Sequence, residues 1–342
     1  MFYLIGTDEA GYGPNLGPLA VTATLWRVED DSLEPERLFE ALAPVVTAKP
    51  TGGTRGKTDA QREVVPIADS KKLHRHDTLE PLETGIFAAL AVLDGEKIPE
   101  TSEAFCDRIC GTEHARERAE VVWNAPETER KLPRNLPRER VPKLGRALAE
   151  VLAQHGAALC GIRSELVFPE RFNDAVEASG SKGVFLSDTT MKLIVHFWDE
   201  IQSQTSKEPQ AENVPEVRVF CDKHGGRNFY LPTLMEFFPN LPFCVVQEGR
   251  AFSEYVHYGR HTALRIRFQA KGEALLPVAL ASMVSKYLRE ISMERFNLWW
   301  RRILPEIHPT AGYPLDAKRF REEISEKMAE LGLDWRAMWR NR

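Results

Sequence analysis

The chain has 342 residues, of which 43% are apolar, and its formal net charge is −5. A chain of this length can bury a large core without disulfides, and its negative charge excludes a general attraction to polyanions, so any contact with nucleic acid must depend on local basic patches and metal ions. The longest apolar run, around residues 86–93, is too short for a membrane helix of about 20 residues, and the chain opens without a signal-like segment, which predicts a cytoplasmic protein.

The first predicted strand ends in two adjacent carboxylates. Residues 2–7 (FYLIGT) are an apolar run typical of a buried strand, and Asp8 and Glu9 follow directly, before a glycine-rich turn. Side chains alternate between the faces of a strand, so these acids can serve one site only if the pleat breaks between them, a break that we assign to Gly11 and Gly13. Paired carboxylates beside open space predict a site for a hard divalent cation, and a solvated acidic turn is the alternative.

A second strand is predicted over residues 18–26, close enough to the first to pair with it as a hairpin. The segment 29–63 contains one short helical pattern and then a stretch rich in Gly, Thr and Lys, which predicts a loop. A helical pattern runs from 76 to 93. Residues 96–143 are highly charged and contain several prolines, so we interpret them as a surface insertion, which a protein partner could contact.

The cysteines do not indicate a disulfide framework, because there are five of them in a long chain. Cys106, Cys110 and His114 are spaced four residues apart and would share one face of a helix. This spacing could hold a zinc ion. The alternative is a coincidence of helical spacing, since no fourth ligand is evident.

Three further strands are predicted at 158–168, 217–221 and 243–246, with helices at 144–155 and from about Ser187. Together with the first two strands they predict a five-stranded mixed α/β sheet flanked by helices.

A third carboxylate follows the strand at 217–221. Asp222 ends this apolar strand and faces a Gly-Gly turn, just as Asp8 ends the first strand. If the two strands are neighbours in the sheet, their ends bring the two carboxylates together. An ordinary turn residue is the alternative.

A fourth candidate lies on a helix predicted over residues 277–291. Ser282, Lys286 and Glu290 recur on one face of this helix at intervals of four residues, which makes Glu290 a candidate neighbour of the carboxylate cluster. The alternative is an exposed Arg289–Glu290 pair.

Several segments of the chain form an ordered set of motifs. They are GTDEAGYGP at 6–14 with Gly-Pro at 17–18, DSKKL at 69–73, ALASMVSKYLRE at 279–290 and Gly-Tyr at 312–313. In this order, with Asp222 between the second and third motifs, they resemble the type 2 ribonuclease H family, the ribonucleases HII and HIII. The resemblance spans the chain as a single domain with insertions at 29–63 and 96–143.

The resemblance implies a ribonuclease H-like fold with a helical C-terminal subdomain at 291–342. It implies a site of four carboxylates that are both catalytic and metal-binding, namely Asp8, Glu9, Asp222 and Glu290. With two Mg²⁺ or Mn²⁺ ions, such a site hydrolyses RNA phosphodiester bonds in RNA/DNA hybrids or at ribonucleotides embedded in duplex DNA. A non-catalytic hybrid-binding protein and a nuclease of altered specificity are the alternatives. No membrane partner is expected.

The resemblance also implies a set of substrate contacts, which are Gly11, Tyr12, Gly13, Ser70, Lys71, Ser282, Lys286 and Tyr313. Tyr12 stands where the family has Arg, so a hydroxyl and a stacking face replace a guanidinium, which affects substrate choice more than chemistry. Tyr313 is a candidate for stacking on the sugar at the junction, with core packing as its alternative. A local basic run is a further candidate for backbone contacts and comprises Arg260, Arg265, Arg267 and Lys271.

Overall fold

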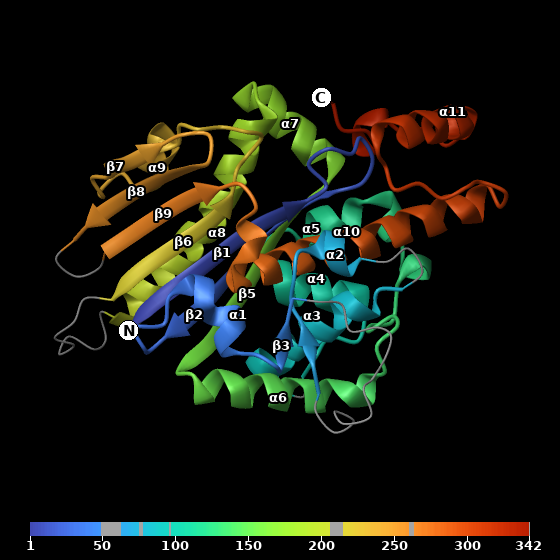
Figure 1. Cartoon of the computed structure of the whole chain (residues 1–342). Helices are drawn as coiled ribbons and strands as arrows, with labels where there is room; N and C mark the ends of the chain where they lie inside the picture. The colour runs from blue at the N-terminus through green and yellow to red at the C-terminus, as the bar shows by residue number, and fades with distance from the viewer. Residues whose placement is uncertain (49–62, 75–77, 96, 206–214, 260–262, 342) are drawn as a thin grey trace.

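The computed structural model describes residues 1–48, 63–74, 78–95, 97–205, 215–259 and 263–341, and its central feature is a seven-stranded mixed sheet (Figure 1). The strand order is β5-β2-β1-β6-β9-β8-β7. The strands are β1 (Phe2–Ala10), β2 (Leu19–Val28), β5 (Ala157–Val167), β6 (Glu216–Asp222), β7 (Cys244–Glu248), β8 (Phe252–Tyr258) and β9 (Ala263–Gln269). Two short strands, β3 (Val46–Thr47) and β4 (Val65–Pro66), pair separately.

The pairing of the central strands agrees with the sequence prediction. β1 and β2 form an antiparallel pair in continuous register, which confirms the hairpin. β6 runs parallel to β1 on its other side, and β9 runs parallel to β6. Because parallel strands end at the same edge of a sheet, the residues that follow β1, β6 and β9 are brought close together.

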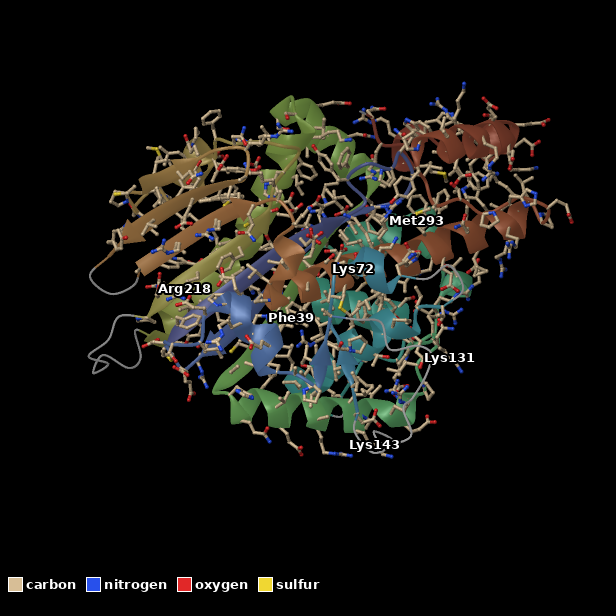
Figure 2. All side chains as sticks on the ribbon, viewed as in Figure 1. Phe39, Lys72, Lys131, Lys143, Arg218 and Met293 are labelled. Carbon is tan, nitrogen blue, oxygen red and sulfur yellow. The ribbon has the colours of Figure 1, made fainter. Side chains whose placement is uncertain are left out.

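The prediction of five strands is wrong, because β8 and β9 were not recognised. In β9 the buried Leu264, Ile266 and Phe268 alternate with Arg265 and Arg267. This alternation is typical of a strand with one covered face, but the arginines led to the interpretation of the segment as a basic run instead. In Figure 1 no helix of the described part of the chain lies in front of β8 and β9, and Figure 2 labels Arg218 on the neighbouring strand β6.

Helices lie on both sides of the sheet, and one further helix lies near the C-terminus. They are α1 (Leu38–Ala41), α2 (Ser70–Leu73), α3 (Glu80–Asp94), α4 (Ser102–Cys110), α5 (Ala115–Glu120), α6 (Val141–Gln154), α7 (Pro169–Ser179), α8 (Lys182–Thr205), α9 (Leu231–Phe237), α10 (Leu276–Ile303) and α11 (Pro314–Glu330). Short 3-10 turns are η1 (Pro35–Arg37), η2 (Val122–Asn124), η3 (Pro126–Thr128), η4 (Arg138–Arg140), η5 (Gly272–Ala274) and η6 (Trp335–Ala337). Helix α10 lies on one face of β1 and β2, and α8 packs on the opposite face with α9 (Figure 1).

Two predicted helix boundaries differ from the structure. The helix expected from Ser187 begins five residues earlier, at Lys182. The helix expected at 277–291 continues without interruption to Ile303, so the predicted subdomain boundary at 291 falls inside α10. Buried residues such as Phe296 and Trp300 continue the apolar contacts of the helix past that point.

Helix α10 approaches the sheet unusually closely at its first turn. A Cβ atom on Gly6 of β1 would lie 2.3 Å from the backbone carbon of Pro277 and 2.4 Å from the backbone nitrogen of Val278. The Thr24 hydroxyl of β2 donates to the Pro277 carbonyl at 2.8 Å. Two turns further on, the Ser285 hydroxyl donates to the Asp8 carbonyl at 3.0 Å. Glycine at position 6 is therefore required for the contact that holds α10 beside the end of β1.

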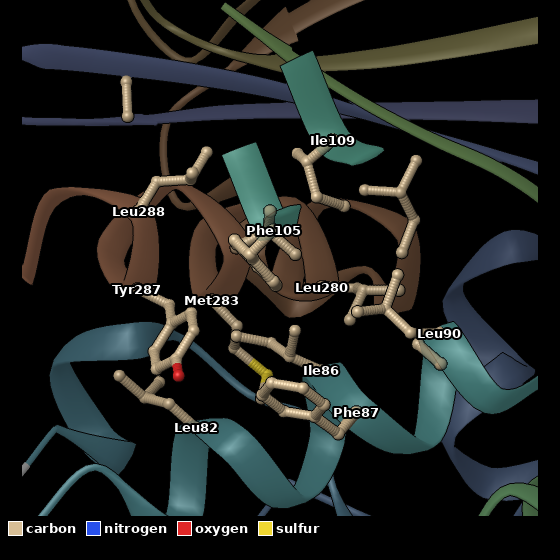
Figure 3. Close-up of a cluster of buried hydrophobic side chains, with 14 of the residues drawn as sticks. Leu82, Ile86, Phe87, Leu90, Phe105, Ile109, Leu280, Met283, Tyr287 and Leu288 are labelled. Carbon is tan, nitrogen blue, oxygen red and sulfur yellow. The ribbon is translucent and has the colours of Figure 1, made fainter. Parts of the chain in front are cut away.

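The prediction that 96–143 lies at the surface is wrong for its described residues, 97–143, several of which are buried in the core. Phe105 and Ile109 of α4 are fully buried, and the Phe105 ring packs with Tyr287 of α10 and Phe87 of α3 (Figure 3). The prediction failed because the apolar residues are sparse among charges, and many of these charges form ion pairs with one another. In the 29–63 segment, residues 49–62 lie outside the described residues, and the rest forms η1, α1 and β3.

A buried carboxylate ties the 97–143 segment to α3 and α10. Glu83 is fully buried and accepts hydrogen bonds from the backbone nitrogens of Arg134, Asn135 and Leu136 at 2.5–2.8 Å. The Tyr287 hydroxyl donates to the same carboxylate at 2.7 Å. Four donors replace the lost hydration of this group, which makes its burial tolerable. Among the described helices none is long and apolar enough to cross a membrane.

Candidate active site

Acidic side chains gather at the edge where β1, β6 and β9 end. The last residue pair between β1 and β6 is Thr7 with Cys221, so Asp8 and Asp222 are the next residues of two adjacent parallel strands. Asp8 is buried and Asp222 is partly buried. The structure therefore brings these two acids to one edge, because neighbouring parallel strands end together.

The expected break in the pleat between Asp8 and Glu9 does not occur. β1 continues in regular register with β2 through Ala10, with Asp8 opposite Thr22 and Glu9 opposite Val21. The two acids consequently leave the strand on opposite sides. The charge of Glu9 nevertheless acts on Asp8, and the charges of Asp222 and Glu273 act on both acids.

The structure adds a carboxylate that the sequence analysis did not select. Glu273 lies in η5, the turn between β9 and α10, and its side chain is 14% exposed. Its charge acts on the carboxyl groups of Asp8, Glu9 and Asp222. The sequence contained a signal for it, since a Lys-Gly-Glu turn follows a strand parallel to β6. That signal becomes visible only once β9 is recognised as a strand.

Glu290 occupies a different environment. Its Oε1 accepts a hydrogen bond from the Lys286 ammonium at 2.6 Å, and its Oε2 lies 3.5 Å from Nε2 of His74. Burial tends to raise its pKa, but the hydrogen bond from His74 and the charge of Lys286 outweigh burial and lower the pKa to about 2. Glu290 is not among the principal charges acting on the other acids. Of the four predicted acids, Asp8, Glu9 and Asp222 therefore share electrostatic influence with one another and with Glu273, whereas Glu290 is paired with Lys286.

The DSKKL segment lies beside these acids, as part of α2. The Asp69 carboxylate caps this short helix by accepting from the Lys71 backbone nitrogen at 3.0 Å. The Lys71 side chain is 83% exposed, and its ammonium lies 4.0 Å from the Glu273 carboxylate. The Ser70 and Ser282 hydroxyls are 3.0 Å apart, and the Ser282 hydroxyl also hydrogen-bonds the Asp8 carboxylate. Ser282 therefore joins α10, α2 and the acidic cluster.

The glycine-rich segment after β1 follows the two acids directly and carries Tyr12. Partial burial, and then the charge of Glu9, raise the pKa of Tyr12. The Lys182 ammonium, at the start of α8, lies 4.9 Å from the centre of the Tyr12 ring. Gly13 is exposed with open space around it. Tyr313 is 54% exposed, so core packing is not its role.

Burial and mutual repulsion shift the acidic cluster toward its neutral forms. Burial, followed by the charge of Glu9, raises the pKa of Asp8 well above its usual value. Burial and then the charge of Asp222 raise the pKa of Glu9 to about 7. Burial and the charge of Glu273 raise the pKa of Asp222. Like charges held together in a partly dry site are a feature of functional centres more often than of structural ones.

One atom of this cluster lacks a partner. The Oδ1 atom of Asp222 is buried and forms no hydrogen bond with the described residues. A hard cation would satisfy this oxygen and offset the repulsion among the four acids. In the described part of the chain, however, no three His, Cys, Asp or Glu side chains are grouped as metal ligands. That result applies equally to Cys106, Cys110 and His114, and His114 instead contacts Arg171, Glu117 and Glu165.

The predicted basic run does not form a free cationic patch. Arg265 and Arg267 both donate to the carboxylate of Glu254, which is 2% exposed. They line a groove together with Arg218, and Glu216 and Glu34 line the same groove. Carboxylates thus compensate these guanidiniums. Arg260 lies outside the described residues.

The sequence matches no protein-family model and no curated protein. Among solved structures it is similar to the ribonuclease HII of Archaeoglobus fulgidus, solved as a complex with PCNA, with a TM-score of 0.40 and 15% identity over 100% of this chain and 95% of that one. It is also similar to ribonuclease H2 from Pyrococcus horikoshii OT3, with a TM-score of 0.40 and 13% identity over 98% of this chain and 92% of that one. For Bst-RNase HIII in complex with Mn²⁺ the TM-score is 0.35 and the identity is 13%, over 99% of this chain and 66% of that one. At these scores the likeness in fold is loose.

Proposed function

We propose that this chain is a divalent-metal-dependent endonuclease of the type 2 ribonuclease H kind. The observation that carries the proposal is the convergence of Asp8, Glu9, Asp222 and Glu273 at the shared end of three strands. Their mutual repulsion costs stability, and so does the unpartnered oxygen of Asp222. Both costs are accounted for if the carboxylates bind divalent metal ions, because a cation is attracted by concentrated negative charge.

The donor set fits a hard divalent cation, because four carboxylates supply the oxygen ligands that Mg²⁺ and Mn²⁺ prefer. Asp8 and Asp222 are the two ligands most fixed by the fold, while Glu9 and Glu273 have longer side chains that can turn toward an ion. Bound ions would neutralise phosphate charge and make water a better nucleophile. Because no three acids are yet grouped as ligands, side-chain rotation has to accompany metal binding.

The chain's own residues would position the substrate. Lys71, exposed beside Glu273, can pair with a phosphate as a point charge. Ser70 and Ser282 fix α2 against the site. Tyr12 offers a ring face and a hydroxyl next to Glu9, and the exposed Tyr313 ring can stack on a sugar. The Lys286 ammonium, by contrast, is engaged with Glu290 and supports α10 rather than the substrate.

The order of motifs along the sequence supports RNA paired with DNA, or ribonucleotides embedded in duplex DNA, as the substrate. The 2′-hydroxyl is the group that distinguishes RNA from DNA at one position, so the contacts near Tyr12 and Tyr313 decide specificity. With Tyr12 in place of Arg, phosphate recognition shifts toward Lys71 and Lys182.

The test is cleavage of matched labelled duplexes that contain one ribonucleotide, a ribonucleotide tract or only DNA, in Mg²⁺ and in Mn²⁺. We expect metal-dependent cutting on the 5′ side of the ribonucleotide, abolished in the Asp8→Asn/Asp222→Asn double variant. Absence of cutting with tight hybrid binding would identify a binding protein instead. Cutting that persists in the double variant would refute the assignment of the site.

A further inference from the structure

Residues 11–18, here called the β1–β2 loop, are held by a segment more than three hundred residues away in sequence. The Arg340 backbone nitrogen donates to the Asn15 carbonyl at 2.8 Å, and Nδ2 of Asn15 donates to the Arg340 carbonyl at 3.1 Å. Leu16 and Trp339 form an antiparallel bridge. In Figure 1 the C-terminal end of the chain accordingly lies beside the loop that leaves β1.

The Arg340 side chain extends under this loop and binds its backbone. Its guanidinium is 1% exposed, and Nη2 donates to the Gly11 carbonyl at 2.5 Å and to the Pro14 carbonyl at 2.6 Å. Gly11 has φ of +91°, and a Cβ atom there would lie 2.7 Å from the Pro18 carbonyl oxygen. The backbone around Tyr12 is therefore tied on both sides, at Gly11 and at Pro14, to one guanidinium.

The segment that carries Arg340 is itself fixed on its far side by α7. Asn173 is 1% exposed, and its Nδ2 donates to the Trp339 carbonyl at 2.8 Å. Its Oδ1 accepts from the Asn341 backbone nitrogen at 2.8 Å. The Arg340 guanidinium also lies 4.8 Å from the centre of the Phe172 ring. One asparagine thus holds the backbone on either side of Arg340, so that its side chain cannot swing away.

Holding the β1–β2 loop in this way lowers the stability of the folded protein, because charged groups are buried without full hydrogen bonding. Nε and Nη1 of Arg340 are buried and form no hydrogen bond with the described residues. A second buried guanidinium, that of Arg289 on α10, donates to the carbonyls of Leu16, Pro18 and Ala311 at 2.7–3.2 Å. Both guanidiniums are bound mainly by carbonyls, so the desolvation free energy of two buried charges is only partly offset. A short turn does not require such a cost for its own stability, and unfavourable features of this kind are concentrated at functional sites.

We infer that Arg340 is a positioning residue that fixes the Gly11–Gly13 backbone toward the substrate and so determines which phosphodiester bond is cut. This inference rests on the proposed nuclease function. Arg340 acts through the loop and touches neither the acids nor the substrate. Without it, the carbonyls of Gly11 and Pro14 are free to turn toward water, and Tyr12 loses its fixed place beside Lys182.

The experiment compares Arg340→Met with Arg336→Met. Arg336 belongs to the same segment and also contacts α7, through Asp174 and Glu177, but its side chain is exposed and does not contact the β1–β2 loop. On a duplex with one ribonucleotide, we expect Arg340→Met to raise KM about tenfold or more and to spread the cut over neighbouring bonds. The kcat at saturating duplex changes less than about threefold, and Arg336→Met leaves all three readouts unchanged.

Other outcomes separate positioning from simple stability. If Arg340→Met lowers the Tm but leaves KM and cut position unchanged well below that Tm, the inference is wrong. Arg340→Lys keeps one donor and is expected to restore part of the effect; it replaces the Met variant if that variant fails to fold. If the wild type cuts nothing, the nuclease proposal fails, and the role of Arg340 is then tested by hydrogen exchange of the backbone amides at residues 11–18. Faster exchange in Arg340→Met than in the wild type and in Arg336→Met supports positioning of the β1–β2 loop. Unchanged exchange overturns the inference.

Discussion

At the scale of single residues, Glu273 influences the other acids at the strand ends, and Glu290 does not appear among their principal charges. Glu273 repels three other acids, whereas Glu290 is paired with the Lys286 ammonium and lies 3.5 Å from His74. A carboxylate already engaged with two partners is a poor metal ligand, because it must break those contacts first. A carboxylate surrounded by like charges gains most from a cation.

This contrast predicts different outcomes for two matched substitutions. Glu273→Gln removes an acid of the cluster and is expected to lower kcat by at least about 100-fold in Mg²⁺. Glu290→Gln removes a structural ion pair and is expected to lower kcat less than about fivefold. Single-turnover cleavage of a ribonucleotide-containing duplex measures both. The reverse order of effects would return the fourth position to Glu290.

Glu290 also predicts a pH dependence of stability. Its folded-state pKa of about 2 lies below the ordinary value of 4.5, so its contribution is complete above pH 4.5 and is lost as the pH falls toward 2. Urea unfolding is expected to show Glu290→Gln less stable than wild type by about 1–3 kcal/mol at pH 7, with the difference shrinking below pH 4.5. Glu322→Gln on the exposed face of α11 serves as the control. A difference that stays constant from pH 7 to pH 3 would contradict this origin.

The sequence was sufficient to find Asp8 and Asp222, because each ends a strongly apolar run and the rule for parallel strands brings such ends together. It was not sufficient for Glu273. That residue follows β9, whose arginines are paired with Glu254 on the next strand. Pairing across strands is a tertiary property that no local pattern contains, so the strand and the acid after it were overlooked together.

At the scale of elements, the contact between β1 and α10 brings the site together. Ser282 and Ser285 of α10 bind the Asp8 carboxylate and backbone, and η5 immediately before α10 carries Glu273. The helix can lie this close only because Gly6 has no side chain toward Pro277. A change at Gly6 should therefore affect both stability and the acidic cluster.

Gly6→Ala is expected to destabilise the protein by at least about 3 kcal/mol, because the new Cβ meets backbone atoms that cannot rotate away. Gly13→Ala provides a matched comparison in the segment that follows β1. No atom lies within 4 Å of a Cβ placed at Gly13, so its cost is expected to stay below about 0.5 kcal/mol. Urea unfolding of both variants measures the contrast, and equal stabilities would show that α10 can shift.

The 97–143 segment illustrates a second limit of sequence reasoning. Its composition is mostly polar, yet the Glu83 carboxylate of α3 accepts hydrogen bonds from three of its backbone N–H groups, and Phe105 is buried in the core. A buried carboxylate can be predicted only when its partners are known, and these partners lie about fifty residues away. The helices α3 and α6, by contrast, have long apolar faces and were found from their periodicity.

At the scale of the whole molecule, stability and the proposed activity oppose each other. The acids at the strand ends are held in place by β1, β6, η5 and α10, so their repulsion cannot relax by moving apart. The buried guanidiniums of Arg289 and Arg340 add a second unfavourable burial near the same edge. The large cores on the two faces of the sheet compensate these local costs.

This opposition predicts how metal ions and a single substitution change the Tm. Asp8→Asn relieves burial and repulsion of a charge, so in EDTA the variant is expected to melt above the wild type. Mg²⁺ at about 100 times its Kd is expected to stabilise the wild type by about 2.7 kcal/mol and to stabilise Asp8→Asn far less. Differential scanning calorimetry with and without Mg²⁺ measures both differences. A wild type that melts at the same temperature in EDTA and in saturating Mg²⁺ would show that the acids do not bind the ion, and an Asp8→Asn variant less stable than wild type in EDTA would show that the Ser282 hydrogen bond outweighs the repulsion.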